Sequence, residues 1–235
     1  SIYWESYEPF TFLAQAAAVT TTLKLGTGIC LVTEHHPIAL AKRVASLDSL
    51  SDGRFLFGIG AGWNAEELEN HGVAFADRWK VLREHVLAMK ACWTTRDAEF
   101  HGRFVDFDPV WVEPKPVQRP HPPVFIGANS HWAIERVAEY AEGWLPILLP
   151  DFRERVAQLH DACRRRGRDP ASIDISVFGA PADPDALAEL AGLGVRRVIA
   201  LLPTLGLDES LKVLDGYRPL VEWARALDST RKNGR

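Results

Sequence analysis

Apolar residues along the chain occur in short continuous runs that alternate with stretches in which apolar positions recur every three or four residues. Short runs bounded by glycine or proline are typical of strands buried on both faces, and the wider spacing is typical of helices that cover a sheet. The predicted strands are residues 23–32, 54–60, 123–127, 143–149, 173–179 and 195–202. The predicted helices are residues 9–20, 38–50, 130–141, 152–166, 184–193 and 208–227, with a short helix ending at Gly72 and a long one that carries Phe75 to Trp93 along one face.

Six strands that alternate with helices predict an α/β fold with a parallel sheet. The pattern is compatible with an open doubly wound sheet and with part of a β/α barrel, and both place a binding site at the carboxyl ends of the strands. One stretch breaks the alternation, because aromatic residues on both sides of His101-Gly102 predict a small hairpin inserted near residues 97–122. We expect a single domain over residues 1–228, with this hairpin as a candidate lid, and a disordered basic tail at 229–235.

Charge and composition narrow the functional classes. The net charge is −4, so the protein as a whole has no electrostatic reason to bind nucleic acid. No run approaches the roughly 18 apolar residues of a membrane helix, and the acidic start of the chain lacks the features of a signal peptide. Cys30, Cys92 and Cys163 are few, odd in number and widely spaced, which predicts a reducing compartment and no disulfide framework. We therefore expect a cytoplasmic protein that binds neither nucleic acid nor a membrane.

Three glycine-bearing strand ends are candidates for contact with a ligand. Residues 58–63 have the spacing G-x-G-x-G, unlike the dinucleotide pattern G-x-G-x-x-G, and they form either a tight strand exit or a place where a flat ligand approaches the backbone. Gly28 lies within a predicted strand, where glycine marks a bulge or a close ligand. Gly127–Ser130 joins a strand to the start of a helix, whose N–H groups either bind a phosphate or are capped by Asn129 or Ser130.

The histidines and tryptophans give weaker indications. His35 and His36 are adjacent, so they point apart in an extended chain, and no clustered acid or H-x-x-x-H spacing accompanies them. We therefore predict no metal site. Trp63 and Trp144 stand at predicted strand ends and are either packing residues or walls of a pocket. The chain has no P-loop and no G-x-S-x-G elbow, and no residue is assigned a catalytic role.

Taken in order, a series of segments carries a resemblance that covers nearly the whole chain. The segments are Glu8-Pro9-Phe10, Ala16–Thr20, Leu23–Gly28, His36-Pro37, Leu50–Phe55, Gly58–Trp63 with Glu66-Glu67, Gly72–Phe75 with Arg78, Pro122–Gly127 and Ala141–Trp144. In this order and spacing they resemble the luciferase-like monooxygenase family, in particular its branch that depends on the deazaflavin coenzyme F420.

This resemblance implies a TIM-type (β/α)8 barrel of the bacterial-luciferase-like kind. Leu23 begins what resembles the third strand of that barrel, so we expect this chain to lack the first two strands. Open strand edges promote association, which favours a homo-oligomer or marginal stability. Adding about 40 upstream residues, enough for a strand–helix–strand unit, is expected to improve both stability and cofactor binding.

The resemblance also implies a cofactor site. Its expected residues are Gly28, Ile29, Gly60, Gly62, Trp63, Gly127, Ala128, Asn129 and Ser130. Gly28-Ile29 matches a non-proline cis peptide that forms a bulge behind the central ring of the cofactor, and Gly127–Ser130 matches the segment that holds its phosphate. Trp63 stands where members that oxidise sugar phosphates carry a glutamate, which argues against that substrate.

The implied activity is hydride transfer between F420 and a small organic substrate. The ring of the cofactor is expected at the carboxyl ends of the strands, where the protein bends the ring, excludes water and orients the substrate. Two alternatives remain open. The first is an FMN-dependent luciferase-like monooxygenase, which activates oxygen. The second is a non-catalytic paralogue.

Overall fold

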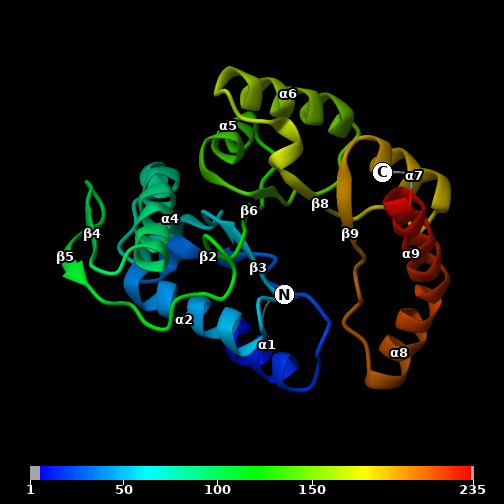
Figure 1. Cartoon of the computed structure of the whole chain (residues 1–235), viewed down its shortest axis with the longest axis horizontal. Helices are drawn as coiled ribbons and strands as arrows, with labels where there is room; N and C mark the ends of the chain where they lie inside the picture. Colours follow the sequence, from blue (N-terminus) through cyan, green and yellow to red (C-terminus); the bar gives the residue numbers. More distant parts are fainter. Residues whose placement is uncertain (1–5, 234–235) are drawn as a thin grey trace. The chain divides into compact units, whose positions relative to one another are not determined.

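The computed structural model describes residues 6–233, and side chains through residue 226 (Figure 1). The chain divides into two compact units, Ser1–Gly127 and Ala128–Arg235. We describe each unit by itself. The elements of the first unit are α1 (Pro9–Ala18), β1 (Leu25–Gly26), β2 (Cys30–Leu31), η1 (Val32–Glu34), α2 (Pro37–Leu50), β3 (Phe55–Gly60), α3 (Ala65–Asn70), η2 (Phe75–Asp77), α4 (Arg78–Thr94), β4 (Ala98–His101), β5 (Asp106–Val110) and β6 (Val124–Ile126).

Strand β3 is the centre of the parallel sheet in the first unit. It pairs with β1 through Leu25 and Phe55, with β2 through Leu31 and Gly60, and with β6 through Ile59 and Ile126. The predicted strand 23–32 is thus two short strands, β1 and β2, and the peptide bond between Gly28 and Ile29 in the gap is cis. The parallel pairing confirms the sequence prediction for this part of the chain.

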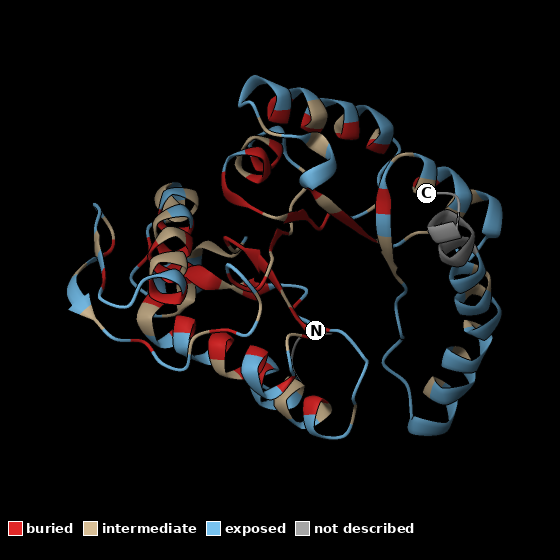
Figure 2. Ribbon diagram, in the orientation of Figure 1, coloured by how far each residue is buried: buried red, intermediate tan, exposed pale blue. Residues whose placement is uncertain are grey.

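The core of the first unit forms because β3 is apolar on both faces. Phe55, Phe57 and Ile59 are fully buried, and Figure 2 shows buried residues concentrated on β3 and on one side of α2. Trp93 of α4 packs edge to face on Phe57, with ring centroids 6.2 Å apart, and its indole N–H donates to the carbonyl of Ala41 at 2.9 Å. The buried indole is therefore both packed and hydrogen-bonded.

Strands β4 and β5 form the antiparallel hairpin in the stretch where the sequence predicts one. Phe100 pairs with Phe107, and His101 pairs with Asp106. Glu84 of α4 accepts hydrogen bonds from the backbone N–H groups of the connecting turn, which fastens the hairpin to the helix.

The second unit continues the alternation of strands and helices. Its elements are α5 (His131–Tyr140), β7 (Gly143–Trp144), α6 (Phe152–Arg165), η3 (Pro170–Ser172), β8 (Asp174–Phe178), α7 (Pro184–Gly192), β9 (Val195–Ile199), α8 (Leu207–Gly216) and α9 (Arg218–Asn233). Strand β8 pairs in parallel with β7 and with β9. Helix α7 is capped by Asp183, whose carboxylate accepts from the N–H of Ala186 at 2.9 Å.

Some predicted boundaries differ from the structure. The predicted strand 143–149 is reduced to β7 and one further parallel bridge between Ile147 and Phe178 of β8, because Pro146 has no N–H for a continuous ladder. The predicted helix 208–227 is two helices, since the first ends at Gly216. Helix α9 extends through residues 229–233, which the sequence assigns to a disordered tail, in a stretch without glycine or proline. Residues 234 and 235 of that tail lie outside the described residues.

Two further properties bear on the class of protein. Within residues 6–233, no helix is long and apolar enough to cross a membrane.

Cys30, Cys92 and Cys163 are buried free thiols, and burial is the main cause that raises the pKa of Cys30 to about 12. A buried thiol that stays protonated is a packing residue and a poor nucleophile.

Candidate active site

The structure brings together two of the predicted ring-binding residues, Ile29 and Gly60. The register of β2 on β3 sets Cys30 beside Ile59 and Leu31 beside Gly60, and Ile29 immediately precedes β2. A Cβ atom placed on Gly60 would lie only 1.9 Å from Cδ1 of Ile29. Glycine is thus required for the side chain of Ile29 to lie across the strand end, and the adjoining cis peptide at Gly28 stands where the resemblance implies one.

Gly62 and Trp63 follow that strand end. Gly62 has a φ of 80°, in the left-handed region that favours glycine, and an added Cβ would lie 3.2 Å from Cδ2 of Leu68. Its presence is therefore explained by the turn into α3 without a ligand. The side chain of Trp63 is 77% exposed, so it is free to contact a ligand.

Trp144, the other tryptophan at a predicted strand end, belongs to the core. Its side chain is fully buried and stacks on Phe152, with ring centroids 5.7 Å apart and an interplanar angle of 14°. Its indole N–H donates to the carbonyl of Ala128 at 2.8 Å. Of the two alternatives, packing is the correct one for Trp144, because no face of its ring remains open to a ligand.

The segment predicted to hold a phosphate is fixed by several hydrogen bonds. The N–H of Gly127 donates to the carbonyl of Ile59 at 2.8 Å, so it is not available to an anion. In the second unit, the side chain of Asn129 donates to the carbonyl of Ile147 at 2.7 Å and accepts from the N–H of Ile147 at 3.1 Å. Ser130 caps α5 by accepting from the N–H of Ala133 at 3.2 Å.

These contacts leave donors at the start of α5 that could meet an anion. The N–H groups of Ala128, Asn129 and Ser130 donate to no other described residue. Arg155 donates to the carbonyl of Asn129 and forms an ion pair with Asp151 at 2.7 Å, which adds a cation beside the same loop. Free amides at a helix start next to a guanidinium are a favourable environment for a phosphate.

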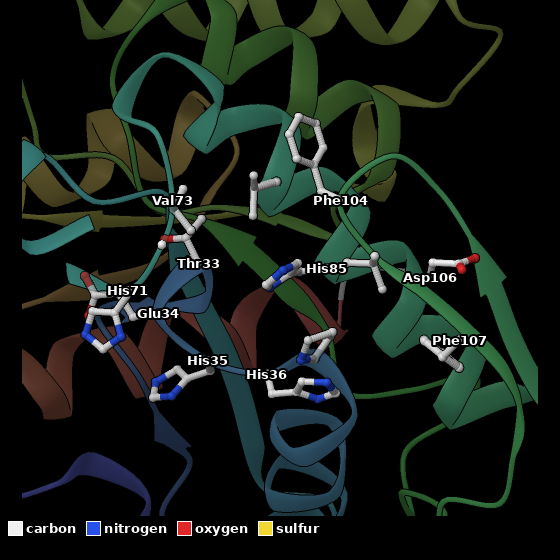
Figure 3. A pocket seen from close by; sticks show the side chains of 14 residues that line it. Thr33, Glu34, His35, His36, His71, Val73, His85, Phe104, Asp106 and Phe107 are labelled. Atoms are coloured by element: carbon white, nitrogen blue, oxygen red, sulfur yellow. The ribbon is translucent and has the colours of Figure 1, made fainter. Parts of the chain in front are cut away.

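A pocket that the sequence did not reveal lies beside η1, the short helix that directly follows β2. Its volume is about 450 Å³, within the usual range for small-molecule sites. One wall is polar and holds Glu34, His35, His36, His71 and His85 (Figure 3). The apolar side chains of the lining include Val73, Val81, Phe104 and Phe107, the last two from the hairpin.

Burial shifts the pKa values of Glu34, His35 and His85, three of the residues that line this pocket. Burial and then the neighbouring carboxylate of Glu67 raise the pKa of Glu34, against the opposing influence of His71. Burial lowers the pKa of His35 and of His85, although the ring of His85 has a stabilising contact at 3.2 Å with the carbonyl of Val32. Groups with shifted pKa values in a cavity are candidates for proton exchange with a substrate.

Only part of this pocket can be predicted from the sequence. His36-Pro37 belongs to the segments that carry the family resemblance, and the hairpin was a candidate lid. His71 and His85 come from a loop and from a helix, far apart in the chain, so no local spacing links them to His36. Across residues 6–233, no group of three or more histidine, cysteine, aspartate or glutamate side chains could hold a metal ion.

Solved structures share the fold of this chain. The crystal structure of monooxygenase RslO1 from Streptomyces bottropensis superposes with a TM-score of 0.76 at 22% identity, over 95% of this chain and 83% of that one. The coenzyme F420 dependent tetrahydromethanopterin reductase from Methanopyrus kandleri superposes with a TM-score of 0.66 at 24% identity, over 77% of this chain and 57% of that one. The fold is that of the luciferase-like β/α-barrel enzymes.

Sequence relatives agree with this fold. An uncharacterized protein of Mycobacterium tuberculosis (strain H37Rv) is 41% identical over 214 residues, which span 88% of this chain and 74% of that protein. The FMNH(2)-dependent dimethylsulfone monooxygenase of Pseudomonas putida is 30% identical over 139 residues, or 58% of this chain and 38% of that enzyme. The family model described as luciferase-like monooxygenase matches residues 1–232. The chain therefore belongs to the luciferase-like monooxygenase family.

Proposed function

We propose that this protein is an oxidoreductase that transfers a hydride between coenzyme F420 and a small organic substrate. Family membership supports an oxidoreductase, and one solved neighbour is an F420-dependent reductase. The observation that carries the proposal is the contact of Ile29 with Gly60 at the end of β3, in a unit that also holds a pocket with shifted acid–base groups. Hydride transfer to or from a polar bond also moves a proton, and in this proposal Glu34 and His85, which line the pocket, exchange it.

The residues present fit a deazaflavin cofactor. The N–H groups of Ala128, Asn129 and Ser130 would bind its phosphate, and Gly127 would not, because its N–H is already used. Ile29 and Gly60 would support one face of the ring, since the absence of a side chain at Gly60 lets the apolar side chain of Ile29 lie over the strand end. When bound, the ring supplies the carbon centre that accepts or donates the hydride.

The chain's own residues perform three tasks in this proposal. The backbone amides and the strand end bind and orient the cofactor. Glu34 and His85 hold or release the proton that accompanies the hydride. The hairpin, through Phe104 and Phe107, covers the pocket and keeps water from the reacting groups.

An FMN-dependent monooxygenase is the second candidate, because the relative from Pseudomonas putida is named as FMNH(2)-dependent. Titration of the protein with F420 and with FMN, followed by oxygen uptake with each reduced cofactor, separates the two. Binding of F420 without oxygen uptake supports the first proposal. Tight binding of FMN with oxygen uptake supports the second, and binding of neither cofactor points to a non-catalytic protein.

Asn129→Pro is expected to weaken F420 binding by about tenfold or more, because proline removes an N–H donor from the phosphate loop. Asn129→Ala is the matched control, since it removes only the two side-chain bonds to Ile147 and keeps the amide. It should bind F420 more tightly than the proline variant. Equal affinities of the two variants, measured by fluorescence titration on folded protein, would show that the amide does not hold the phosphate.

Gly60→Ala tests the strand end. The new Cβ would displace Cδ1 of Ile29 and push that side chain into the space where the ring would lie, so F420 affinity should fall by about tenfold. Ile29→Val removes Cδ1, and the next atom, Cγ1, is 3.3 Å from the added Cβ. The double variant should therefore recover most of the affinity. A Gly60→Ala protein that binds F420 like the parent would place the ring elsewhere.

A further inference from the structure

The pocket beside η1 has an uneven distribution of charge. The described residues that line it include two carboxylates, Glu34 and Asp106, and neither lysine nor arginine. Burial lowers the pKa of His35 and of His85, which favours neutral imidazoles in the polar wall near pH 7. Asp106 already forms an ion pair with His101 at 2.7 Å, so Glu34 is the carboxylate of the lining that has no ion-pair partner among the described residues. An anion that enters the pocket would be repelled, and a cation would be attracted.

Glu34 has an unmet hydrogen-bonding requirement. Its Oε1 atom is buried and accepts a hydrogen bond from no described residue. A buried carboxylate oxygen without a donor is destabilising, and because the side chain of Glu34 lines the pocket, a ligand that brings an N–H group can donate to this carboxylate. Figure 3 shows Glu34 in the polar wall, on the same side as His71 and His35.

The apolar part of the lining suits hydrocarbon attached to that N–H group. Its side chains are Phe104 and Phe107 of the hairpin and the buried Val73 and Val81. Aromatic faces attract organic cations, and burial of a ligand's hydrocarbon against these side chains adds a hydrophobic contribution. A metal ion does not fit, because no three ligating side chains among the described residues converge.

We propose that this pocket binds organic amines as cations, with the nitrogen on Glu34 and the hydrocarbon on Phe104 and Phe107. That such amines are the substrate class of the enzyme rests on the proposed function. The binding itself does not, because every group that it uses belongs to the first unit and lies in the pocket.

Calorimetric titration with benzylamine, benzyl alcohol and benzoate at about pH 7.5 tests the charge preference, since these probes share a phenyl ring and are cationic, neutral and anionic at that pH. No cofactor is added. Benzylamine is expected to bind most tightly and benzoate least, with a ratio of about tenfold or more between them. Undetectable benzylamine binding, or benzoate binding as tight as that of benzylamine, would overturn the proposal.

Single-residue variants test which side chains cause the preference for the cationic probe. Glu34→Gln keeps the size of the side chain and removes its charge, so the preference for benzylamine over benzyl alcohol should disappear. Phe104→Ala should weaken both probes alike. Glu66→Gln is the control, because Glu66 is an exposed carboxylate on α3 outside the pocket, and it should leave all affinities unchanged. A Glu34→Gln protein that retains the amine preference would also overturn the proposal.

The two proposals fail in different ways. If the oxidoreductase proposal is wrong, the F420 titrations of the Asn129 and Gly60 variants will show it. If the amine proposal is wrong, the cofactor-free titrations of the Glu34 variant will show it. Each set of measurements can fail while the other succeeds.

Discussion

Replacing Arg54 by alanine is expected to lower the free energy of unfolding by about 3–5 kcal/mol. Arg54 immediately precedes β3 and is only 8% exposed. A charged group this deeply buried is tolerated because each arm of its guanidinium has a partner. Removal of the side chain leaves those partners as buried acceptors without donors, which is among the costliest kinds of substitution.

The hydrogen bonds of Arg54 join three separate parts of the first unit. Its Nε donates to the carbonyl of Ser51 at 2.6 Å, within the turn between α2 and β3. Its Nη1 donates to Oγ1 of Thr20 and to the carbonyl of Leu23, both at 2.9 Å. Its Nη2 donates to the carbonyl of Ala17 at 2.9 Å, at the end of α1. Arg54 therefore fixes the chain between α1 and β1 against the start of β3.

Urea unfolding followed by tryptophan fluorescence measures the effect. Arg96→Ala is the control, because Arg96 is exposed and only lies over the ring of Trp111, 4.9 Å from its centroid. It should change stability by no more than about 0.5 kcal/mol. The free energy of unfolding of Arg54→Lys should lie between those of the parent and Arg54→Ala, or lower still, since lysine keeps the charge but lacks the planar fork of donors. Equal midpoints for Arg54→Ala and Arg96→Ala would refute this account.

The sequence was most informative where one local rule dominates. The run from Phe55 to Gly60 is apolar on both faces, which only a strand covered by helices can accommodate, and β3 is that strand. Helix starts were accurate where a capping residue precedes proline, as at Asp183. The strand at 23–32 was located but not its interruption, because apolar character does not distinguish a continuous strand from two short ones joined at Gly28-Ile29.

The candidate site could be predicted less well from such local rules. The resemblance assigns the whole segment Gly127–Ser130 to the phosphate, whereas the N–H of Gly127 is already bonded to the carbonyl of Ile59. Nothing local shows that Asn129 reaches Ile147 or that His71 and His85 enclose one cavity with Glu34. Those relations depend on how distant segments pack, which hydrophobic periodicity does not specify.

Glu84→Ala is expected to release the hairpin from α4 and to lower stability by about 2–4 kcal/mol. The Oε2 atom of Glu84 accepts from the N–H of Phe104 at 2.6 Å and from that of Val105 at 3.0 Å, and Oε1 accepts from the N–H of Arg103 at 3.1 Å. Hydrogen bonds to an ionised acceptor are among the strongest in proteins. One carboxylate thus holds three consecutive residues of the turn.

Digestion with trypsin measures the release of the hairpin directly, because the turn contains the exposed Arg103, after which trypsin can cleave. Cleavage after Arg103 should be about tenfold faster or more in Glu84→Ala than in the parent, as opening becomes more frequent. Glu99→Ala is the matched control, since Glu99 lies on the same hairpin and is exposed, 3.9 Å from the ring of His101. It should leave the cleavage rate unchanged. The released hairpin should also weaken benzylamine binding, because Phe104 and Phe107 leave the pocket.

Acid should remove the difference between the parent and Glu84→Ala. Burial by itself would raise the pKa of Glu84, but the three backbone donors, with that of Phe104 foremost, outweigh it and lower the pKa overall. A carboxyl whose pKa is lower in the folded state stabilises the protein above its ordinary pKa and loses that contribution as the pH falls through the lowered value. The gap in melting temperature should therefore be full at pH 7 and shrink below about pH 4. A gap that stays constant down to about pH 3 would mean that the charge of Glu84 does not hold the hairpin, and that shape alone accounts for the contact.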